Sequence, residues 1–472
     1  MMDPRRFVKR LPVADALLDR MAYAGARGDR RAALLNALLP SGALAHSLTF
    51  AVAPAGEEVL SWPVRLPPLT ALLAPGSPLT GAQVVVHTRP PAPGAYRELI
   101  QHGVPAHRWT YVAVSSDDPA SAATWTQNVL RQHGFTAAQL DQDELLDVVA
   151  FLGGLDGAAA SAKLIERGFE ACTMGAELHV CFTWSEAPVL ELLSRFPAVP
   201  ATVGVRVART GGEFVAERVL RLSGPDVKAL QSAETWLANG VRHAGRLQRL
   251  NGHHASAAAV TVPVCVPPSL PSKQSWTHVE PPHVAGRAAA WTGGAGVVLG
   301  WDVVRQAHAP LRLFRERPVV GVVTSARLAH LVAARSVSCG AGVTVQSEAP
   351  WPGPFGHARP GPPAVALGGP RLPHLLVLDR PAEVPGLAGL PGSHHAVLVV
   401  ADLGPEHVPL LEVADFAVAG DLGAPQQSLL RGVFGTWLDD LPLVPGQVTV
   451  IGRGVAARVG ITLTGQEHHL LG

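Results

Sequence analysis

The 472-residue sequence is poor in charge and in long apolar runs, and each shortage excludes a class of protein. Charged residues make up 16% and the net charge is +1, so no general basic field exists to attract nucleic acid. The longest apolar candidate, residues 319–334, is broken by polar side chains, so no transmembrane helix is predicted. No apolar run with a small-residue cleavage site follows the basic start, so no secretory signal is predicted.

Cysteine is also scarce, with four residues in the chain. No two of them have the C-x-x-C spacing of a zinc or redox site. We therefore expect buried, unpaired thiols in a protein of a reducing compartment. The four are Cys172, Cys181, Cys265 and Cys339.

Apolar residues, in contrast, make up 47% of the chain, which is enough for a globular core, and the length favours two or three domains. The pattern along the chain predicts a mixed α/β fold in two packed units with mixed sheets. We expect a basic helical segment at residues 1–45, an α/β domain at 46–262, a proline-rich linker at 263–290 and a second α/β domain at 291–472.

The N-terminal segment carries an excess of basic side chains. A basic start of this kind lies against anionic lipid or a partner, or it is simply the solvated face of a helix, and the second interpretation is favoured. The basic residues are Arg5, Arg6, Lys9, Arg10, Arg20, Arg27, Arg30 and Arg31, against Asp3, Asp15, Asp19 and Asp29.

The first α/β domain is predicted from strands that alternate with helices. Residues 83–88 and 108–118 have the pattern of strands. Asp118 followed by Pro119 predicts a helix N-cap and first helical residue, and Gly134 predicts the end of that helix. Further strands are predicted at 47–53, 57–66, within 178–222, and at 374–380, 394–402 and 414–420. Helices are predicted at 142–153 and 224–245, and hairpins at 293–314 and after 446.

Residues 321–347, "GVVTSARLAHLVAARSVSCGAGVTVQS", have the strand–helix–strand order of a Rossmann-like nucleotide-binding fold. A dinucleotide site needs G-x-G-x-x-G at the first turn, and a P-loop needs G-x-x-x-x-G-K-[ST]. The turn here is Thr324-Ser325-Ala326, and the glycines come later, at Gly340 and Gly342. We therefore expect the outline of a nucleotide fold without its phosphate loop, in which only N–H groups at the helix start could attract an anion.

The helix within this stretch has an apolar face made by Leu328, Leu331 and Val332. Arg335 falls on the same face, seven positions after Leu328. An arginine there extends to the edge of the face or meets an acidic side chain within the chain or in another subunit. The first arrangement is the one we expect.

For three other residue patterns that could carry chemistry, a structural role is favoured over a catalytic or binding role. Asp141-x-Asp143 matches the D-x-D pattern of sugar-nucleotide transferases, but acidic residues also favour a helix start. Adjacent histidines on a strand point to opposite faces, so the three such pairs are not expected to bind a metal. Four tryptophans are expected to be core or interface anchors rather than base-stacking platforms. These residues are His253-His254, His394-His395, His468-His469, Trp109, Trp236, Trp291 and Trp301.

The motifs of common hydrolases are absent from the sequence, which contains neither G-x-S-x-G nor H-E-x-x-H. The residues therefore predict no catalytic group, no cofactor-binding group and no metal ligand.

Four stretches resemble the EccE component of actinobacterial type VII (ESX) secretion systems. They are "GAQVVVHTRPPAP" at 81–93, "RWTYVAVSSDDPASAATWTQNVLRQHGFTAAQLDQDEL" at 108–145, the segment at 218–264 with its "RVLRLSGPDVKAL" start, and the segment at 296–347 with "GVVLGW" and "LRLFRERPVVGVV". The likeness covers roughly residues 80–350.

The resemblance implies an architectural role in protein export. EccE-like subunits belong to an inner-membrane core with EccB-, EccC- and EccD-like proteins, in which the EccC ATPase supplies the energy. The family carries no known catalytic residues, so the resemblance implies none here and no cofactor. It implies a position at the cytoplasmic face of the plasma membrane.

One departure from the family concerns the membrane. Family members usually begin with two transmembrane helices, and this sequence shows none. We expect either that the gene start lies upstream or that this member is peripheral, held by its cytoplasmic domain and basic N-terminus. The alternative function is a cytoplasmic enzyme of nucleotide or sugar-nucleotide type, with a non-standard site near Thr324–Ala326.

Overall fold

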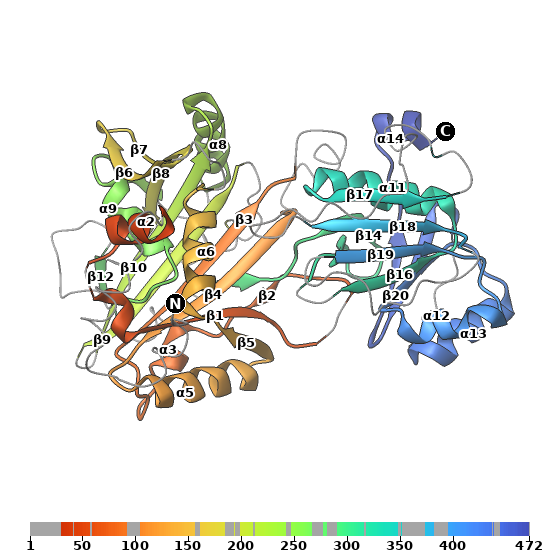
Figure 1. Cartoon of the computed structure of the whole chain (residues 1–472), viewed down its shortest axis with the longest axis horizontal. Helices are drawn as coiled ribbons and strands as arrows, with labels where there is room; N and C mark the ends of the chain where they lie inside the picture. Colours follow the sequence, from red (N-terminus) through yellow and green to blue (C-terminus); the bar gives the residue numbers. More distant parts are fainter. Residues whose placement is uncertain are drawn as a thin grey trace, which may run out of the picture. The chain divides into compact units, whose positions relative to one another are not determined.

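The computed structural model gives each element of the chain its bounds and its neighbours (Figure 1). It describes residues 30–40, 42–56, 59–91, 104–155, 161–184, 193, 199–210, 213–241, 247–266, 277–280, 290–315, 318–347, 351, 373–381, 395–436, 438 and 444–471. The predicted basic segment therefore lies outside the described residues, except for its last part.

The chain divides into two compact units, and each is built from segments that are separate in the sequence. The first unit comprises Met1–Ala55, Val64–Arg89 and Arg108–Thr292, and the second comprises Gly56–Pro63, Pro90–His107 and Gly293–Gly472. Two short segments that we expected in the first α/β domain, 56–63 and 90–107, thus belong to the second unit.

The first unit is an 11-stranded sheet with helices on its faces. Its helices are α2 (Arg30–Leu38), α3 (Leu69–Leu72), α5 (Pro119–Gln132), α6 (Gln142–Leu152), α8 (Val227–Val241) and α9 (His254–Ala258), with 3-10 turns η2 (Ala43–His46) and η3 (Ala259–Thr261). Its strands are β1 (Ser47–Pro54), β3 (Gly81–Arg89), β4 (His107–Ser115), β5 (Phe135–Gln139), β6 (Ser161–Arg167), β7 (Ala171–Gly175), β8 (Glu177–Trp184), β9 (Ala201–Thr210), β10 (Glu213–Gly224), β11 (Leu247–Arg249) and β12 (Thr277–Glu280).

The strand order of the first unit is β5-β1-β4-β3-β9-β10-β8-β7-β6, and β9, β10 and β8 pair antiparallel. Apolar side chains of α3, α5 and α8 pack on one face, and those of α2, α6 and α9 pack on the other. A separate pair of short strands, β2 (Val64–Arg65) and β13 (Trp291–Thr292), completes the unit. The predicted antiparallel strands within 178–222 are confirmed.

The helix starts of the first unit follow the local sequence. Asp118 accepts a hydrogen bond from the Ser121 N–H, and Pro119 is the first residue of α5, as predicted. Gly134 follows the helix with φ of 82°, a conformation that costs glycine little.

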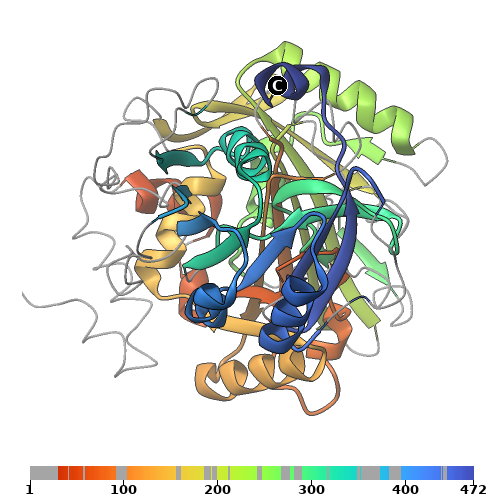
Figure 2. The same ribbon diagram turned by 90° about the vertical axis from the view of Figure 1, so that its right-hand side faces the viewer.

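The second unit is a nine-stranded sheet in order β15-β14-β22-β21-β20-β16-β19-β18-β17. Its strands are β14 (Val297–Asp302), β15 (Ala307–Leu311), β16 (Val319–Val323), β17 (Gly342–Gln346), β18 (His374–Asp379), β19 (His395–Val400), β20 (Phe416–Ala419), β21 (Gln447–Gly452) and β22 (Val455–Gly460). Its helices are α11 (Ala326–Ser338), α12 (Val408–Val413), α13 (Ala424–Phe434) and α14 (Gly465–Leu471), with the 3-10 turn η6 (Pro405–His407). Helix α14 is the dark blue helix marked C in Figure 2.

Strands β20, β16, β19, β18 and β17 are parallel, and β21, β22, β14 and β15 continue the sheet antiparallel. Counted along the chain, the parallel strands lie in the order 5-1-4-3-2. This is neither the Rossmann order 3-2-1-4-5-6 nor the flavodoxin-like order 2-1-3-4-5. The strand–helix–strand outline predicted at 321–347 is confirmed, but β16 and β17 are not neighbours.

The two faces of the parallel strands are covered by different helices. Helix α11 lies over one face and α12 and α13 lie over the other, as Figure 1 shows. Their buried side chains belong to two separate apolar clusters. After the last residue of α11, Gly340 takes a φ of 82°, and the N–H of Ala341 donates back to the Ser336 carbonyl oxygen. The glycine stop predicted for this helix is confirmed.

Two sequence predictions need correction. The proline-rich stretch at 263–290 was expected to be a linker, but Thr277–Glu280 forms β12, which pairs with β10. The strand expected at 57–66 shrinks to Val64–Arg65 and an isolated bridge between Leu60 and Leu311.

In the described part of the chain, none of the helices has both the length and the apolar character that crossing a lipid bilayer requires.

Candidate functional site

The carboxyl edge of the parallel strands in the second unit is the candidate site. From β16 the chain crosses to β17 through α11, past β19 and β18. From β19 it crosses the other way to β20 through α12, past β16. Ligands of open α/β sheets bind where neighbouring strands lead in opposite directions, at the carboxyl ends. That place lies beside the ends of β16 and β19.

The turn that follows β16 is short, and the first of its two residues is already hydrogen-bonded. Two residues, Thr324 and Ser325, connect the strand to α11. The Thr324 N–H donates to the Val418 carbonyl oxygen at 3.1 Å, and the Thr324 hydroxyl accepts from the Gly420 N–H at 3.3 Å. The turn is thus tied to β20 and has no glycine to bring backbone close to a phosphate.

The start of α11 still offers N–H groups. Ser325 is the N-cap residue, with φ of −145° and ψ of 132°, but its side chain makes no capping hydrogen bond. Arg327 is exposed in the first turn, where the helix dipole disfavours a positive charge. This end of the helix could attract an anion, but it lacks the loop that would enclose a triphosphate.

The two acidic residues described at the same edge either accept hydrogen bonds from other side chains or are largely exposed to solvent. The Asp379 Oδ2 atom accepts hydrogen bonds from the Ser347 hydroxyl at 2.9 Å and from the Trp351 Nε1 at 3.0 Å. Asp402 is 76% exposed and lies 3.7 Å from the Arg380 guanidinium. Neither carboxylate forms a cluster with other ligands, and the described residues contain no group of three His, Cys, Asp or Glu side chains that could hold a metal.

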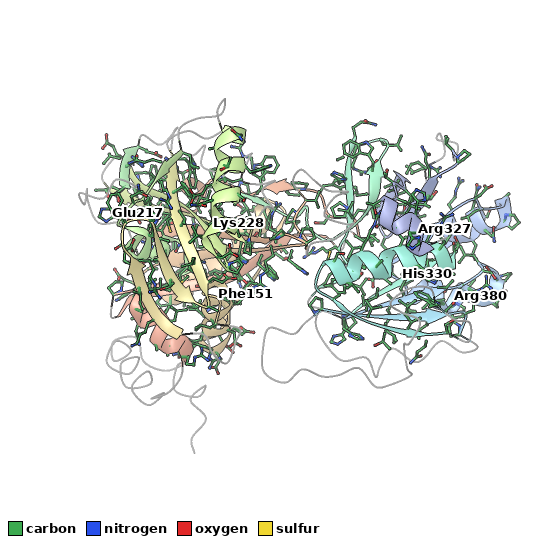
Figure 3. All side chains as sticks on the ribbon, turned by 90° about the horizontal axis from the view of Figure 1, so that it is seen from above. Phe151, Glu217, Lys228, Arg327, His330 and Arg380 are labelled. Carbon is green, nitrogen blue, oxygen red and sulfur yellow. The ribbon has the colours of Figure 1, made fainter. Side chains whose placement is uncertain are left out.

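His330 of α11 completes this polar edge. Its ring meets the Trp351 ring edge-on at 3.9 Å between centroids. Burial lowers the pKa of His330, and the Asp379 carboxylate acts in the opposite direction. The ring is therefore a neutral packing group at neutral pH, and Figure 3 places it on α11 in the same part of the unit as Arg327 and Arg380.

Arg380 has a strained backbone, with φ of 49°. A left-handed conformation costs a non-glycine residue about 1–2 kcal/mol. Its N–H donates to the Val400 carbonyl oxygen at 3.1 Å, which holds the residue in place at the end of β18. Strain of this kind often marks functional sites, although here no second group converges on the guanidinium except Asp402 among the described residues.

Arg335, which we expected to extend to the edge of α11, is instead buried, with 1% of its side chain exposed. Its Nε and Nη2 donate to the two carboxylate oxygens of Glu467 at 2.7 and 2.9 Å. Nη1 donates to the carbonyl oxygens of Val298 and Leu299, and Nη2 also donates to that of Thr462. All five N–H donors of the guanidinium are used.

The acceptors that surround this guanidinium arise from local structure. The pairing of β14 with β15 shifts register between Val298 and Gly300, a bulge at the carbonyl groups that Arg335 binds. Glu467 is fixed by Thr464, since the Thr464 N–H donates to Oε2 and the Thr464 hydroxyl accepts from the Glu467 N–H. Burial tends to raise the pKa of Glu467, but the bonds and charge of Arg335 and the bonds of Thr464 outweigh it and lower that pKa.

The first unit contains buried ion pairs that the sequence did not reveal. Arg206 on β9 donates to Glu217 on β10 at 3.1 Å, and Arg218 on β10 donates to Glu280 on β12 at 2.5 Å. Each of these side chains is no more than 8% exposed. The available signal was the charge at interior positions of "EFVAERVLRL", where an apolar strand would be expected.

Arg221, on the face of β10 opposite to that of Arg218, is fully buried, and no carboxylate among the described residues forms a salt bridge with it. It donates to the Leu152 carbonyl oxygen at 2.8 Å and to the Thr202 hydroxyl at 3.2 Å. Burial lowers its pKa, and the neighbouring Cys181 and Cys172 thiols act in the opposite direction. Cys181 lies directly opposite Arg221 in the pairing of β8 with β10.

The cysteines are buried and unpaired, as predicted. Burial raises the pKa of Cys172 and of Cys265 to about 12, and it raises that of Cys181 well above its usual value. Burial likewise lowers the pKa of His179 to about 3. These groups stay neutral at physiological pH, so the thiols are poor nucleophiles.

The D-x-D pattern is a helix start, as expected. The Asp141 side chain accepts from the Glu144 N–H at 2.9 Å, and the Glu144 carboxylate accepts from the Asp141 N–H at 2.8 Å. This capping box leaves Asp143 exposed in the first turn of α6.

The structure separates the histidines of one pair and divides the tryptophans. His254 is buried and accepts the Cys181 N–H, while His253 is exposed; His394 lies outside the described residues. Trp109 and Trp236 pack against apolar clusters, in line with the prediction of core or interface anchors. Trp301 is 40% exposed on β14, so it does not anchor the core of the second unit.

Comparison with known proteins gives no family assignment. No protein-family model and no curated protein matches the sequence. Among solved structures, the chain is similar to the cytoplasmic domain of EssC, with 13% identity and a TM-score of 0.26 over 52% of this chain and 56% of that one.

A second similar structure is the cytoplasmic domain of the Thermomonospora curvata type VII secretion ATPase EccC. Its identity is 13% and its TM-score 0.24, over 54% of this chain and 35% of that one. The chain thus spans little more than half of the first structure and about a third of the second. Both TM-scores are too low to assign a shared fold.

Proposed function

We propose that this protein is a non-catalytic structural subunit of a type VII secretion complex, of the EccE kind. It serves as a scaffold for protein export at the cytoplasmic face of the plasma membrane. Its partners are EccB-, EccC- and EccD-like subunits, and its basic N-terminus contributes contact with anionic lipid. The likeness of residues 80–350 to EccE supports the partners and the location.

The single observation that carries the non-catalytic role is the turn between β16 and α11. At the position where a nucleotide fold grips phosphate, two residues connect strand and helix, and Thr324 is bonded to β20 through both its N–H and its hydroxyl. Opening a loop there would break these hydrogen bonds, at a cost of about 0.5–1.5 kcal/mol each. The sheet therefore serves packing rather than phosphate transfer.

The contact between α11 and the C-terminal helix α14 supports the same role. The Arg335 guanidinium fixes α11 to the C-terminal helix α14 through two hydrogen bonds to Glu467. It donates three more to the carbonyl oxygens of Val298, Leu299 and Thr462. An α11 fixed in this way is a rigid support, whereas lids and loops that close over substrate belong to the less stable parts of a fold. The proposed subunit uses this rigidity to hold its partners at fixed positions.

A second candidate function is an enzyme of nucleotide or sugar-nucleotide type. The uncapped start of α11, with Arg327 exposed beside it and the strained Arg380 at the same sheet edge, is the observation that favours it. A donor phosphate would take the N–H groups of that helix end.

Isolation of the protein from its native bacterium in mild detergent tests the proposed function. A tag on this protein should recover EccB-, EccC- or EccD-like subunits in membrane fractions, and the same tag on an unrelated protein should not. Recovery of the tagged protein alone, entirely in the cytosolic fraction, would contradict the proposal.

A further inference from the structure

The sheet of the second unit ends at β17, and the outer side of that strand has no hydrogen-bonding partner among the described residues. Strand β17 pairs in parallel with β18, from Gly342 opposite His374 to Gln346 opposite Leu378. The Gly342 N–H donates to the Pro373 carbonyl oxygen at 2.9 Å, so residues 342, 344 and 346 bond to β18. The N–H and C=O groups of Val343 and Val345 face outward.

The opposite edge of the same sheet is protected. Strand β15 contains Pro310, which cannot donate to a further strand. The segment before β2 also bonds along it, since the Ser61 N–H donates to the Pro310 carbonyl oxygen and the Arg312 N–H donates to that of Val59. Folded proteins shield edge strands in such ways because an open edge recruits another chain.

The edges of the first unit differ from β17 as well. Strand β6 carries the exposed charges of Lys163 and Arg167 and an irregular register before Ile165. Strand β5 is mostly exposed and has Ala137 and Ala138 at its centre, residues with little preference for strands. Strand β6 is therefore charged, and the uncharged β5 has a single β-branched residue, Thr136.

Strand β17 has no charge and is rich in β-branched residues. Val343, Thr344 and Val345 are β-branched and favour an extended backbone. Val345 is 4% exposed and packs in the core beneath α11, so the strand is already ordered and pairing would cost little further entropy. From Cys339 to Ser347 the chain carries no charged residue.

We propose that β17 pairs with β17 of a second copy of this chain, antiparallel, across a two-fold axis at Thr344. Val343 then faces Val345 of the second copy in hydrogen-bonded pairs on both sides of the axis, and the two Thr344 residues face each other without backbone bonds. This register uses the outward groups of Val343 and Val345, and it joins two nine-stranded sheets into one.

The lack of charge favours a second copy over an acidic or basic extended segment. In a two-fold pair both strands have the same sequence. A charged residue in one strand would therefore lie close to the same charge in the other strand and be repelled by it. The uncharged run from Cys339 to Ser347 avoids this penalty, and it gives a charged partner nothing to recognise. A stable protein interface buries about 1,200–2,000 Å² in total. Five paired residues on each strand bury less than that, so the dimer is weak and its population depends on concentration.

Sedimentation equilibrium of the full chain tests the pairing. The mass should rise from one chain toward two as the protein goes from low to high micromolar concentration. Val343→Pro removes an outward N–H while it leaves the bonds to β18, and it should raise the dissociation constant at least tenfold. Val343→Thr keeps that N–H and the side-chain shape, so it should dimerise like the wild type; circular dichroism checks that both variants fold.

A second variant places charge on the axis. Thr344→Lys sets two lysines opposite each other and should weaken the dimer at low salt, with recovery at high salt because the repulsion is screened. A single-chain mass at every concentration would overturn the proposal. Equal dimerisation of the wild type, Val343→Pro and Thr344→Lys would overturn it as well, since the contact would then lie elsewhere.

Discussion

Arg335 of α11 and Glu467 of α14 form a two-point ion pair inside the second unit, although 132 positions separate them in the sequence. The guanidinium has no unsatisfied donor, since three carbonyl oxygens take the N–H groups that the carboxylate does not. The pair therefore fixes the last helix of the chain onto the helix that covers the parallel strands.

Glu467→Gln is predicted to destabilise the second unit by about 3–5 kcal/mol, because it leaves the buried positive charge of Arg335 without a counter-charge. Chemical denaturation measures this loss. Glu406→Gln is the control, since Glu406 is 68% exposed beside His407 and its removal should cost about 0–1 kcal/mol. Equal effects of the two substitutions would show that the Arg335–Glu467 pair contributes no special stability.

The same carboxylate predicts a dependence of stability on pH. The pKa of Glu467 is lowered in the folded protein from its ordinary value of 4.5, so the unfolded state takes up the proton first on acidification. Its contribution is complete above that ordinary value and is lost as the pH falls through the folded pKa. Denaturation of the wild type and Glu467→Gln between neutral and acidic pH should show their difference shrinking; a constant difference would contradict the assigned direction.

Leu331→Ala is predicted to destabilise the second unit by about 2–5 kcal/mol, since the side chain is 1% exposed and its removal leaves a cavity. Val337→Ala on the same helix is the control, because Val337 is 46% exposed and should lose no more than about 0.5 kcal/mol. A loss for Leu331→Ala of less than about 0.5 kcal/mol would mean that α11 is not packed as described.

Gly321→Ala is predicted to cost about 1–3 kcal/mol, because a Cβ atom there would overlap the ring of Phe416 on the neighbouring strand β20. Phe416→Leu in the same chain should recover part of the loss, which a double-mutant cycle measures as coupling. Gly432→Ala in α13, where a Cβ meets nothing within 4 Å, should be neutral or stabilising. Additive effects of Gly321→Ala and Phe416→Leu would argue against the overlap.

Local features of the sequence predicted local features of the fold. Asp118 and Pro119 marked the start of α5, and Leu328, Leu331 and Val332 marked the buried face of α11, because caps and helical periodicity act over a few residues. The turn after β16 was also predicted to lack a phosphate loop from its residues alone.

Long-range features were out of reach of the same reasoning. The partner of Arg335 depends on a helix 132 positions away and on a bulge in β14, so its burial was predicted wrongly. Glu280 sits in a proline-rich stretch with no strand pattern, yet it pairs with Arg218, and the two stabilise β12 against β10. Such contacts are set by which strands become neighbours, which periodicity does not encode.

The central claim is that the sheet edge after β16 does not bind a nucleotide. The most direct test measures the unfolding free energy of the protein in the presence of Mg²⁺ and each member of a panel of nucleotides and sugar nucleotides. A ligand at a hundredfold excess over its dissociation constant would stabilise the protein by about 2.7 kcal/mol. We predict no change with any member of the panel. A saturable stabilisation by one of them, lost in Arg327→Ala, would contradict the claim and favour the enzyme.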